Sequence, residues 1–235
     1  MKAAHIPGIF NDVMGPVMRG PSSSHTAAAH RIGSMIRQAG GPDFSKVSVK
    51  FDKSSALATT YLGQGSALGL AGGLLGLEMT DPEIVNYEKH LGNSSFSIEY
   101  LITDLENKHP NAYDIHVQYP GREDLHILAI SSGGGMIEIV QWNDVSVALK
   151  GDFFETLLFY RPVDGQKVFE IENKLNTRLT GFKLYKSQDN DQNLLLNIKY
   201  SKNQSKEIEK IAGLIATPYL QYNLQPVMPT PLLPK

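Results

Sequence analysis

The order of apolar and polar positions predicts two helices and a strand in the first third of the chain. Apolar side chains recur at helical spacing from about residue 27 to residue 38, where Thr26 or Ser24 can cap the helix and Gly40-Gly41 ends it. Residues 47–52 alternate between apolar and polar, which indicates a half-buried strand. Residues 64–77 are mostly Gly, Ala and Leu, which predicts a helix lying very close to a neighbouring backbone or a ligand.

Strand patterns dominate the stretch that follows. They cover residues 96–102, 112–119, 125–131, 136–142 and 145–150. Two helices near the front and a run of strands behind them are typical of an α+β domain with a largely antiparallel sheet.

A second series of strand and helix patterns begins at Gly151. The expected strands are 153–160, 180–187, 193–200 and 219–227, and the expected helices are 166–175 and 205–215. That order, βαββαβ, is the ferredoxin-like plan. The sequence therefore predicts two domains, residues 1–150 and residues 151–228, followed by a loose tail at 229–235.

Composition narrows the classes of function. The 22 Lys+Arg and 24 Asp+Glu give a formal charge of −2, and the scattered basic residues do not indicate nucleic-acid binding. The most apolar window, residues 67–77, is too short and too rich in Gly to span a membrane. The first ten residues do not have the pattern of a signal peptide, so we expect a cytoplasmic protein. Because the chain contains no Cys, disulfides and thiolate metal ligands within it are excluded.

A group of hydroxyl side chains stands at the start of the first helix. Gly20-Pro21 fixes an extended entry, and the residues that follow are Ser22, Ser23, Ser24, His25 and Thr26. Several donors and the positive end of the helix dipole converge there, which predicts a site for a carboxylate or phosphate. His25 adds a group that can change charge near neutral pH. The alternative is an elaborate N-cap with a surface histidine. A serine hydrolase is not indicated, because adjacent Ser24 and His25 do not face each other on a helix and no Gly-x-Ser-x-Gly elbow is present.

Four separated stretches resemble the beta chain, or beta domain, of iron–sulfur-dependent L-serine dehydratases. GPVMRGPSSSHTAAAHRIG at 15–33 closely resembles the signature of that family. Three more stretches agree in order: GQGSALGLAGGLLGLE at 63–78, HPNAYDI at 109–115 and SSGGGMIEIV at 131–140. The C-terminal pattern resembles the small ACT domain that follows the beta portion in two-chain members.

The resemblance implies a reaction and a partner. The family removes water from L-serine and ends with pyruvate and ammonia, using an iron of a 4Fe–4S cluster that has an open coordination position. Cluster ligands are thiolates, and this chain has none. The resemblance therefore implies a separate alpha chain that carries the Cys residues and the cluster, with no metal held by this chain. Without that partner the chain would not catalyse.

The resemblance also assigns roles to particular residues. The hydroxyl side chains would hold the substrate carboxylate or shape its pocket, and other polar groups would lie nearby: Ser22, Ser23, Ser24, Thr26, Gln64 and Asn111. His25 and His109 are candidates for the catalytic base. Taken from the residues alone, His109-Pro110-Asn111 is an ordinary turn.

One position departs from the family pattern. Where the family usually reads Gly-His-Gly-Thr-Asp, this chain has Gly63-Gln64-Gly65-Ser66-Ala67. The family histidine there is thought to contact the substrate and is a candidate for the base, whereas Gln can hydrogen-bond but takes no proton at neutral pH. Three outcomes follow: the base lies elsewhere, the pocket is retuned for another β-substituted amino acid or hydroxy acid, or the chain has lost catalysis. In the last case it would be a non-catalytic amino-acid-binding or regulatory module.

Structural roles are expected for the remaining features. The glycines at 133–135 predict a sharp turn or a close approach to a neighbour, and Trp142 predicts a core position. No partner is assigned to His5, His30, His90, His116 or His126, and the spacing of His25 and His30 does not indicate a zinc site. The C-terminal domain is expected to pair two copies of the chain, with effector binding as an addition.

Overall fold

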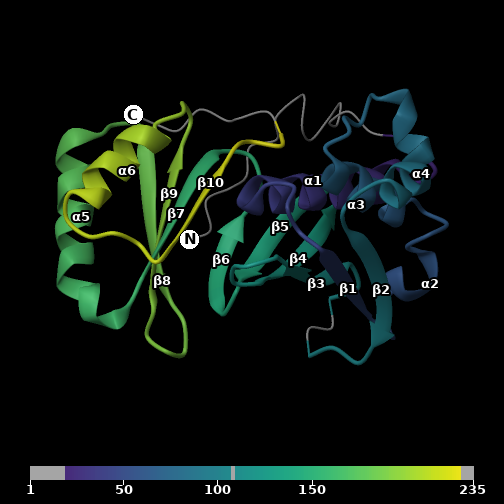
Figure 1. The fold of residues 1–235 in the computed structure, drawn as a ribbon, viewed down its shortest axis with the longest axis horizontal. Helices are drawn as coiled ribbons and strands as arrows, with labels where there is room; N and C mark the ends of the chain where they lie inside the picture. Colours follow the sequence, from purple (N-terminus) through teal and green to yellow (C-terminus); the bar gives the residue numbers. More distant parts are fainter. Residues whose placement is uncertain (1–18, 107–108, 229–235) are drawn as a thin grey trace.

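The chain forms two β-sheets with helices packed on them (Figure 1). The structure is a computed structural model that describes residues 19–106 and 109–228. The expected tail at 229–235, the first ten residues and the start of the 15–33 stretch lie outside the described residues. None of the helices in the described ranges combines the length and apolar composition needed to cross a lipid bilayer.

The first sheet has six strands in the order β2-β1-β3-β4-β5-β6. The strands are β1 (Lys46–Asp52), β2 (Ser97–Thr103), β3 (Ala112–Gln118), β4 (Leu125–Gly133), β5 (Met136–Trp142) and β6 (Val145–Leu149). All neighbouring pairs are antiparallel except β1 and β2. The helices of this unit are α1 (Ser23–Gly40), α2 (Leu57–Thr60), α3 (Ser66–Leu75), α4 (Tyr87–Gly92) and a 3₁₀ helix at Pro82–Asn86.

The second sheet has four antiparallel strands in the order β10-β7-β9-β8. Its elements are β7 (Phe154–Tyr160), α5 (Gly165–Arg178), β8 (Phe182–Gln188), β9 (Leu194–Tyr200), α6 (Ser205–Gly213) and β10 (Leu220–Leu224), with a 3₁₀ turn at Pro162–Asp164. This is the expected βαββαβ order, and the α+β class is confirmed. The likeness to an ACT domain and the pairing of two chains stay predictions.

The start of the first helix differs from the expected one. α1 begins at Ser23, and its N-cap Ser22 is extended and makes no capping hydrogen bond with its side chain. The prediction that Thr26 or Ser24 caps a helix starting near residue 27 is therefore wrong. The Thr26 hydroxyl lies inside the helix and donates to the Ser22 carbonyl oxygen at 3.0 Å.

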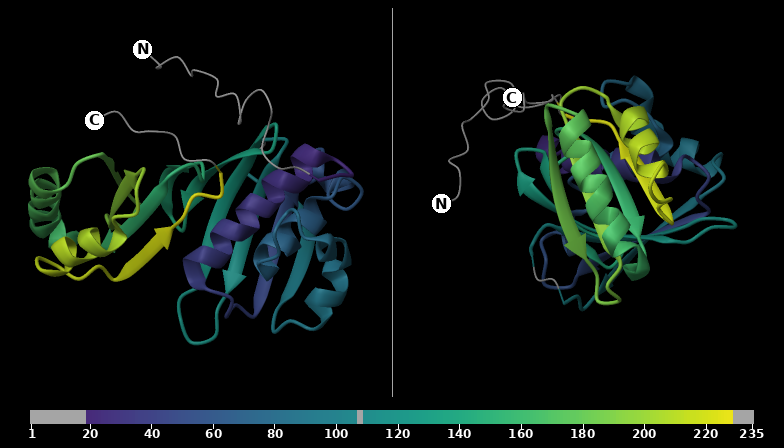
Figure 2. Two further views of the ribbon diagram at one scale, coloured as in Figure 1. Left: turned by 90° about the horizontal axis from the view of Figure 1, so that it is seen from above. Right: turned by 90° about the vertical axis from the view of Figure 1, so that its left-hand side faces the viewer.

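The two sheets share a hydrophobic core. Along β7, Leu158 and Tyr160 pack beneath α5 and α6, whereas Leu157 and Phe159 face the other way and join the core of the first sheet. Figure 2 (left) shows the consequence, with α5 and α6 on the outer flank and the second sheet between them and α1. Trp142 is fully buried in the shared core, as expected. The chain passes from one sheet to the other between residues 149 and 154, and the domain boundary near residue 150 stays a prediction.

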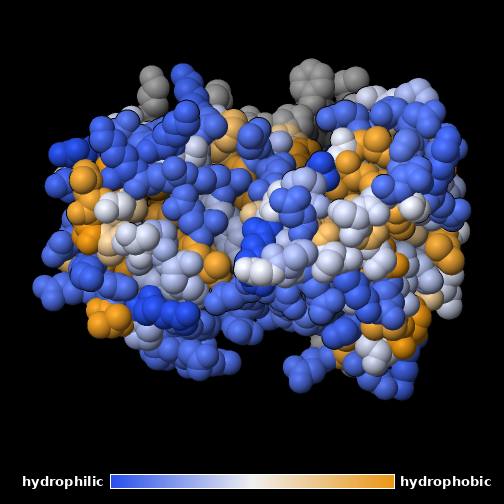
Figure 3. Space-filling model, viewed as in Figure 1, coloured by the Kyte–Doolittle hydropathy of each residue, from blue (hydrophilic) through white to orange (hydrophobic). Residues whose placement is uncertain are grey.

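The surface is mainly polar. In the face shown in Figure 3, hydrophilic residues predominate and apolar ones are scattered. The most exposed large apolar side chains include Val163, Phe169 and Leu214.

Candidate functional site

Helices α1 and α3 run parallel with their backbones in contact. A Cβ added to Gly69 would collide with the Thr26 carbonyl oxygen, and one added to Gly73 would collide with that of His30. A Cβ on Gly33 would in turn lie 2.5 Å from the Leu70 carbonyl oxygen. Residue numbers rise together along the two helices, so their N-termini lie at the same end of the sheet. The close approach expected from the small residues is confirmed, and it places two positive helix ends near each other.

The hydroxyl-rich turn holds His25 rather than capping the helix. The Ser22 hydroxyl lies 2.8 Å from His25 Nδ1, within hydrogen-bond distance. Ser23 is exposed, Ser24 and His25 are half-buried, and Thr26 is buried. The N–H groups of the first helical turn have no partner within the helix, since the first such bond runs from Thr26 N–H to the Ser22 carbonyl. These donors are therefore available to an anion.

The loop that carries Gln64 rests directly on this turn. The Ser22 N–H donates to the Gln64 carbonyl oxygen at 3.3 Å. Gly65 has a φ of +83°, and a Cβ there would collide with the Thr26 hydroxyl and lie 3.0 Å from the Pro21 ring. Only glycine can adopt this backbone conformation and lie this close to Thr26 and Pro21. The Gln64 side chain is half-buried, so position 64 belongs to the surroundings of the turn.

The start of α3 is joined to the start of β3. The Tyr113 hydroxyl donates to the hydroxyl of buried Ser66 at 3.1 Å. Burial raises the pKa of Tyr113 to about 12, so this donor keeps its proton at neutral pH. Ala67 is also buried. A carboxylate at position 67 would therefore be buried as well.

His109 and Asn111 form the turn that enters β3, as expected from their sequence. The Asn111 N–H donates to His109 Nδ1 at 3.2 Å, and the Asn111 carbonyl oxygen accepts from the Ser131 N–H at 3.0 Å. The turn therefore lies beside the end of β4. Asn111 precedes Tyr113 by two residues in the sequence.

The three glycines at the end of β4 form the sharp turn into β5, as expected. Gly133, Gly134 and Gly135 have φ values of +99°, +58° and +76°, which L side chains rarely adopt. The Gly135 carbonyl oxygen accepts a hydrogen bond from the guanidinium of Arg31 on α1. Burial lowers the pKa of Arg31 to about 10, which still leaves the side chain charged at neutral pH.

A ring of four contacts therefore joins the four stretches that resemble the family. Ser22 contacts Gln64, Ser66 contacts Tyr113, Asn111 contacts Ser131, and Gly135 contacts Arg31. His25, Thr26 and Gln64 lie together, whereas His109 and Asn111 are linked to them through α3 and β3. The result is a polar region at the paired helix starts with donors suited to an anion. The roles of the individual residues toward a substrate stay predictions.

Comparison with known proteins identifies the family. Over 150 residues the chain is 33% identical to the L-serine dehydratase beta chain of Peptoniphilus asaccharolyticus, covering 63% of this chain and 67% of that protein. The chain belongs to the L-serine dehydratase beta-chain family. A protein of Bacillus subtilis (strain 168) named probable L-serine dehydratase, beta chain, is 37% identical over 141 residues, which cover 60% of this chain and 63% of that protein. The matches thus span about two thirds of each relative's length. No family model matches the chain.

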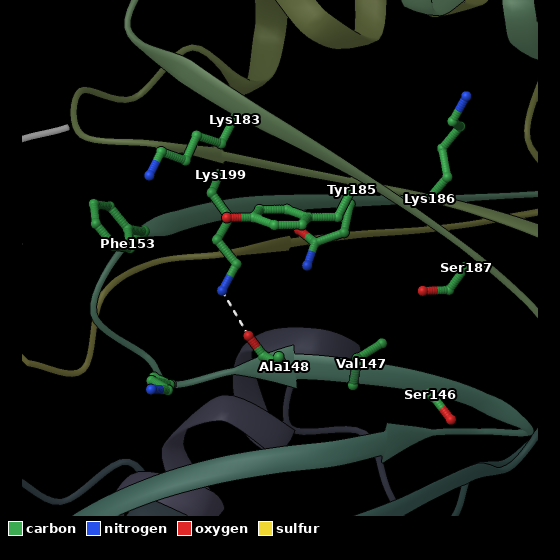
Figure 4. Close-up of a pocket in the computed structure, with 11 residues that line it drawn as sticks. Ser146, Val147, Ala148, Phe153, Lys183, Tyr185, Lys186, Ser187 and Lys199 are labelled. Carbon is green, nitrogen blue, oxygen red and sulfur yellow. Dashed lines mark hydrogen bonds between the residues drawn. The ribbon is translucent and has the colours of Figure 1, made fainter. Parts of the chain in front are cut away.

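A lysine-lined cavity lies in another part of this family member. It has a volume of about 460 Å³ between β6 and the β8–β9 hairpin, and its charged lining consists of Lys150, Lys183, Lys186 and Lys199. Figure 4 shows Lys199 reaching across from the second sheet to the Ala148 carbonyl oxygen, a hydrogen bond of 2.6 Å. The buried amide oxygen of Asn197 lines the same cavity and has no hydrogen-bond partner among the described residues. Lys186 pairs with Glu172 at 2.8 Å and Lys199 with Glu155 at 3.4 Å, which leaves Lys150 and Lys183 as the lining ammonium groups that have no ion pair among the described residues and could attract an anion.

Sequence reasoning missed a second polar cluster. His116 and His126, treated above as unrelated, stack with ring centroids 4.0 Å apart, and both approach Asp114. Part of the cluster could be predicted from the sequence, since Asp114 and His116 are two residues apart on one strand and therefore share a face of the sheet. The pairing of β3 with β4 was needed to add His126. His30 contacts the Leu77 carbonyl oxygen and His90 contacts Glu83, whereas His5 lies outside the described residues.

Proposed function

We propose that this chain is the beta subunit of an iron–sulfur-dependent L-serine dehydratase, which converts L-serine to pyruvate and ammonia together with an alpha chain. The observation that supports this most strongly is the ring of contacts that joins the starts of α1, α3 and β3 and closes at Arg31 in the middle of α1. It gathers the four stretches shared with the family into one region that has donors for a carboxylate.

The residues of this chain do not fit an iron–sulfur cluster. Cluster irons are held by thiolates, and the sequence contains no Cys. The donors of the hydroxyl-rich turn are hydroxyl, amide and imidazole groups. The cluster is therefore assigned to the alpha chain, and the role proposed for this chain is to bind and orient the substrate.

The carboxylate of serine would lie at the start of α1. The unpaired N–H groups of the first turn and the hydroxyls of Ser23 and Ser24 would donate to it, and the dipoles of two parallel helices would favour its charge. The Ser22 hydroxyl contacts Nδ1 of His25, so Nε2 is the ring atom that would meet the substrate. In the tautomer in which Nδ1–H donates to the Ser22 hydroxyl oxygen, Nε2 has a free lone pair and is suited to accept the α-proton. His109 is the alternative base.

The test is turnover by the assembled enzyme. The chain would be co-expressed without oxygen together with the Cys-rich product of a neighbouring gene, and pyruvate formation from L-serine would be measured. His25→Ala should lower kcat/KM about 100-fold or more, as expected for loss of a general base, and Ser24→Ala should raise KM. His90→Ala is the matched control, because His90 also pairs with a side chain at a helix but lies on α4. The thermal midpoints of all three variants should match the wild type.

Two results would overturn the proposal. A cluster-loaded complex that forms no pyruvate from serine would remove the serine assignment. Unchanged kinetics in both His25→Ala and Ser24→Ala would show that the hydroxyl-rich turn has only a structural role. Gln64→His refines the outcome: serine turnover should rise if Gln64 narrowed the activity, and a fall would mean that the pocket is built around the amide.

The lysine-lined cavity favours a second candidate function, the binding of an anionic amino acid or metabolite as a regulatory module. Isothermal titration of the full chain with small dicarboxylates should then show saturable binding that Lys183→Gln weakens. Binding of equal strength in Lys183→Gln would remove this candidate.

A further inference from the structure

Three ligand-type side chains meet on the outer face of the first sheet. Asp114 and His116 alternate with buried Ile115 along β3, so they point away from α1 and α3. His126 lies on β4 directly opposite His116 in the strand register. All three side chains are partly exposed, with 19%, 42% and 29% of the Asp114, His116 and His126 side chains accessible to solvent.

The three ligand atoms are arranged around one point. Oδ1 of Asp114 lies 3.1 Å from Nε2 of His116 and 3.2 Å from Nε2 of His126, and one ligand atom from each residue lies within 4.8 Å of the others. The two rings are stacked at an interplanar angle of 13°, so both present the same edge to the carboxylate. A metal about 2.1 Å from each atom would see the two Asp–His separations at angles of about 100°, between octahedral and tetrahedral values. The stacked rings would turn toward each other to bring both Nε2 lone pairs onto the ion.

We propose that Asp114, His116 and His126 bind a divalent first-row transition-metal ion, with Zn²⁺ as the representative. Two imidazoles and one carboxylate are ligands that suit this class of ion, and three protein ligands leave a coordination position for water. The site is separate from the hydroxyl-rich turn. It departs from the expectation that no residue of this chain binds a metal.

The charge around the cluster favours a cation. The two histidines line a cavity of about 340 Å³. Its lining also carries five carboxylates and one guanidinium: Glu123, Asp124, Asp144, Asp189, Asp191 and Arg161. Lys50, opposite Asp114 on β1, is the neighbouring positive group that opposes binding.

Metal binding also requires one tautomer of both histidines. In the metal-free chain an Nε2–H can donate to Asp114, whereas a bound ion needs the Nε2 lone pair. Metal binding must therefore move the ring proton to Nδ1 on both histidines.

The experiment uses the full chain with any affinity tag removed and with metals stripped by a chelator. Calorimetric titration with Zn²⁺ at pH 7.5 should give one ion per chain. His126→Ala and Asp114→Asn should each weaken zinc binding roughly 100-fold. Loss of a residue that only hydrogen-bonds to a metal ligand already lowers metal affinity about 10–100-fold. His90→Ala is the matched control. His90 lies 3.4 Å from the Glu83 carboxylate, but no second histidine among the described residues joins that pair, so the variant should leave zinc binding unchanged.

A second measurement separates metal ligation from loss of folding. Long-range ¹H–¹⁵N spectra of the imidazoles should show Nε2 of His116 and His126 losing its proton when Zn²⁺ is added to wild-type protein. His126→Gln, which keeps a polar side chain of similar size, should melt like the wild type in chelator and still lose the ion. Less than one ion per chain, equal affinity in His126→Ala, or a retained Nε2–H would each overturn the proposal.

Discussion

Glu155 is a carboxylate that the fold buries between the two sheets. It is 1% exposed, and its only ion pair among the described residues is with Lys199, whose Nζ lies 3.4 Å from Oε1. Burial raises the pKa of Glu155 to about 7, although Lys199 opposes the shift. The group therefore keeps a proton in the folded chain that the unfolded chain releases at a lower pH.

This shift predicts a pH-dependent loss of stability. Between about pH 4.5 and pH 7 the folded state binds more protons than the unfolded state, so the free energy of unfolding falls as pH rises and levels off above pH 7. Glu155→Gln removes the titration while keeping the shape of the protonated acid. The variant should match the wild type at pH 5 and exceed its stability at pH 8, by at most about 3 kcal/mol.

Urea unfolding at the two pH values checks this prediction. Glu170→Gln, on the exposed side of α5, is the control and should change stability little at either pH. A difference between Glu155→Gln and wild type that is the same at pH 5 and pH 8 would show that the carboxylate does not titrate in this range.

Residue types could be predicted from the sequence better than residue partners. The cluster of hydroxyl side chains at the start of α1 stands out in the sequence. The capping role expected of Thr26 is wrong, because the helix begins at Ser23, three residues before Thr26. The contact between Ser22 and His25 depends on that start. Likewise, Asp114 and His126 are twelve residues apart in the chain, and only the pairing of β3 with β4 brings them together.

At the scale of elements, the contact between α1 and α3 is the feature on which the candidate site depends. Gly69→Ala would place a methyl group against the carbonyl oxygen of Thr26, the last residue of the hydroxyl-rich turn. Overpacking of this kind costs about 1–3 kcal/mol, and here a rigid backbone atom is the obstacle. We expect loss of stability and, in the assembled enzyme, a larger loss of turnover, because the two helix starts would be forced apart.

Unfolding in urea and pyruvate formation would measure the two effects. Gly92→Ala is the matched control, since Gly92 ends helix α4 and an added Cβ there meets nothing within 4 Å. If Gly69→Ala kept both wild-type stability and wild-type turnover, the close helix contact would have no importance for the site.

The sequence predicted elements with strong periodicity and missed those without it. The strands in both sheets lie within a few residues of the expected ranges, because alternation at period two, or a short apolar run as in β7, marks them directly. The short helices α2 and α4 were not expected, since a helix of four to six residues has too few turns to show a pattern. The parallel pairing of β1 with β2 could not be predicted either, because it depends on how the intervening helices cross.

At the scale of the whole molecule, α1 connects the candidate site with the second sheet. Its first turn carries the hydroxyl-rich turn, and Gln38 in its last turn accepts a hydrogen bond from the Gln225 N–H at 2.6 Å. The helix rises about 24 Å between these ends. The hydroxyl-rich turn therefore lies at the opposite end of α1 from this contact with the second sheet.

The shared core was visible in the sequence only in part. The strand β7 is apolar at successive positions rather than alternate ones, a pattern that indicates burial on both faces. One face is covered by α5 and α6, as a ferredoxin-like unit requires. Nothing in the pattern says that the other face is covered by the first sheet rather than by a second chain.

A shared core predicts that the two sheets unfold together. Trp142 on β5 packs edge-on against Tyr222 on β10 with ring centroids 5.1 Å apart, and Tyr222 packs against Phe159 on β7 at 5.9 Å. Since Trp142 is the only Trp in the sequence, its fluorescence reports on the first sheet at this contact. Phe159→Ala should lower the free energy of unfolding by about 3–5 kcal/mol, the usual cost of emptying a buried aromatic site.

The shape of the transition decides between one core and two. In both wild type and Phe159→Ala, unfolding followed by Trp142 fluorescence should coincide with unfolding followed by far-ultraviolet circular dichroism, because both sheets depend on the same packing. Phe169→Ala, which removes an exposed ring from α5, is the control and should leave the midpoint nearly unchanged. If Phe159→Ala shifted the circular dichroism transition and left the fluorescence transition in place, the sheets would be independent. The packing of Leu157 and Phe159 against the first sheet would then contribute little to its stability.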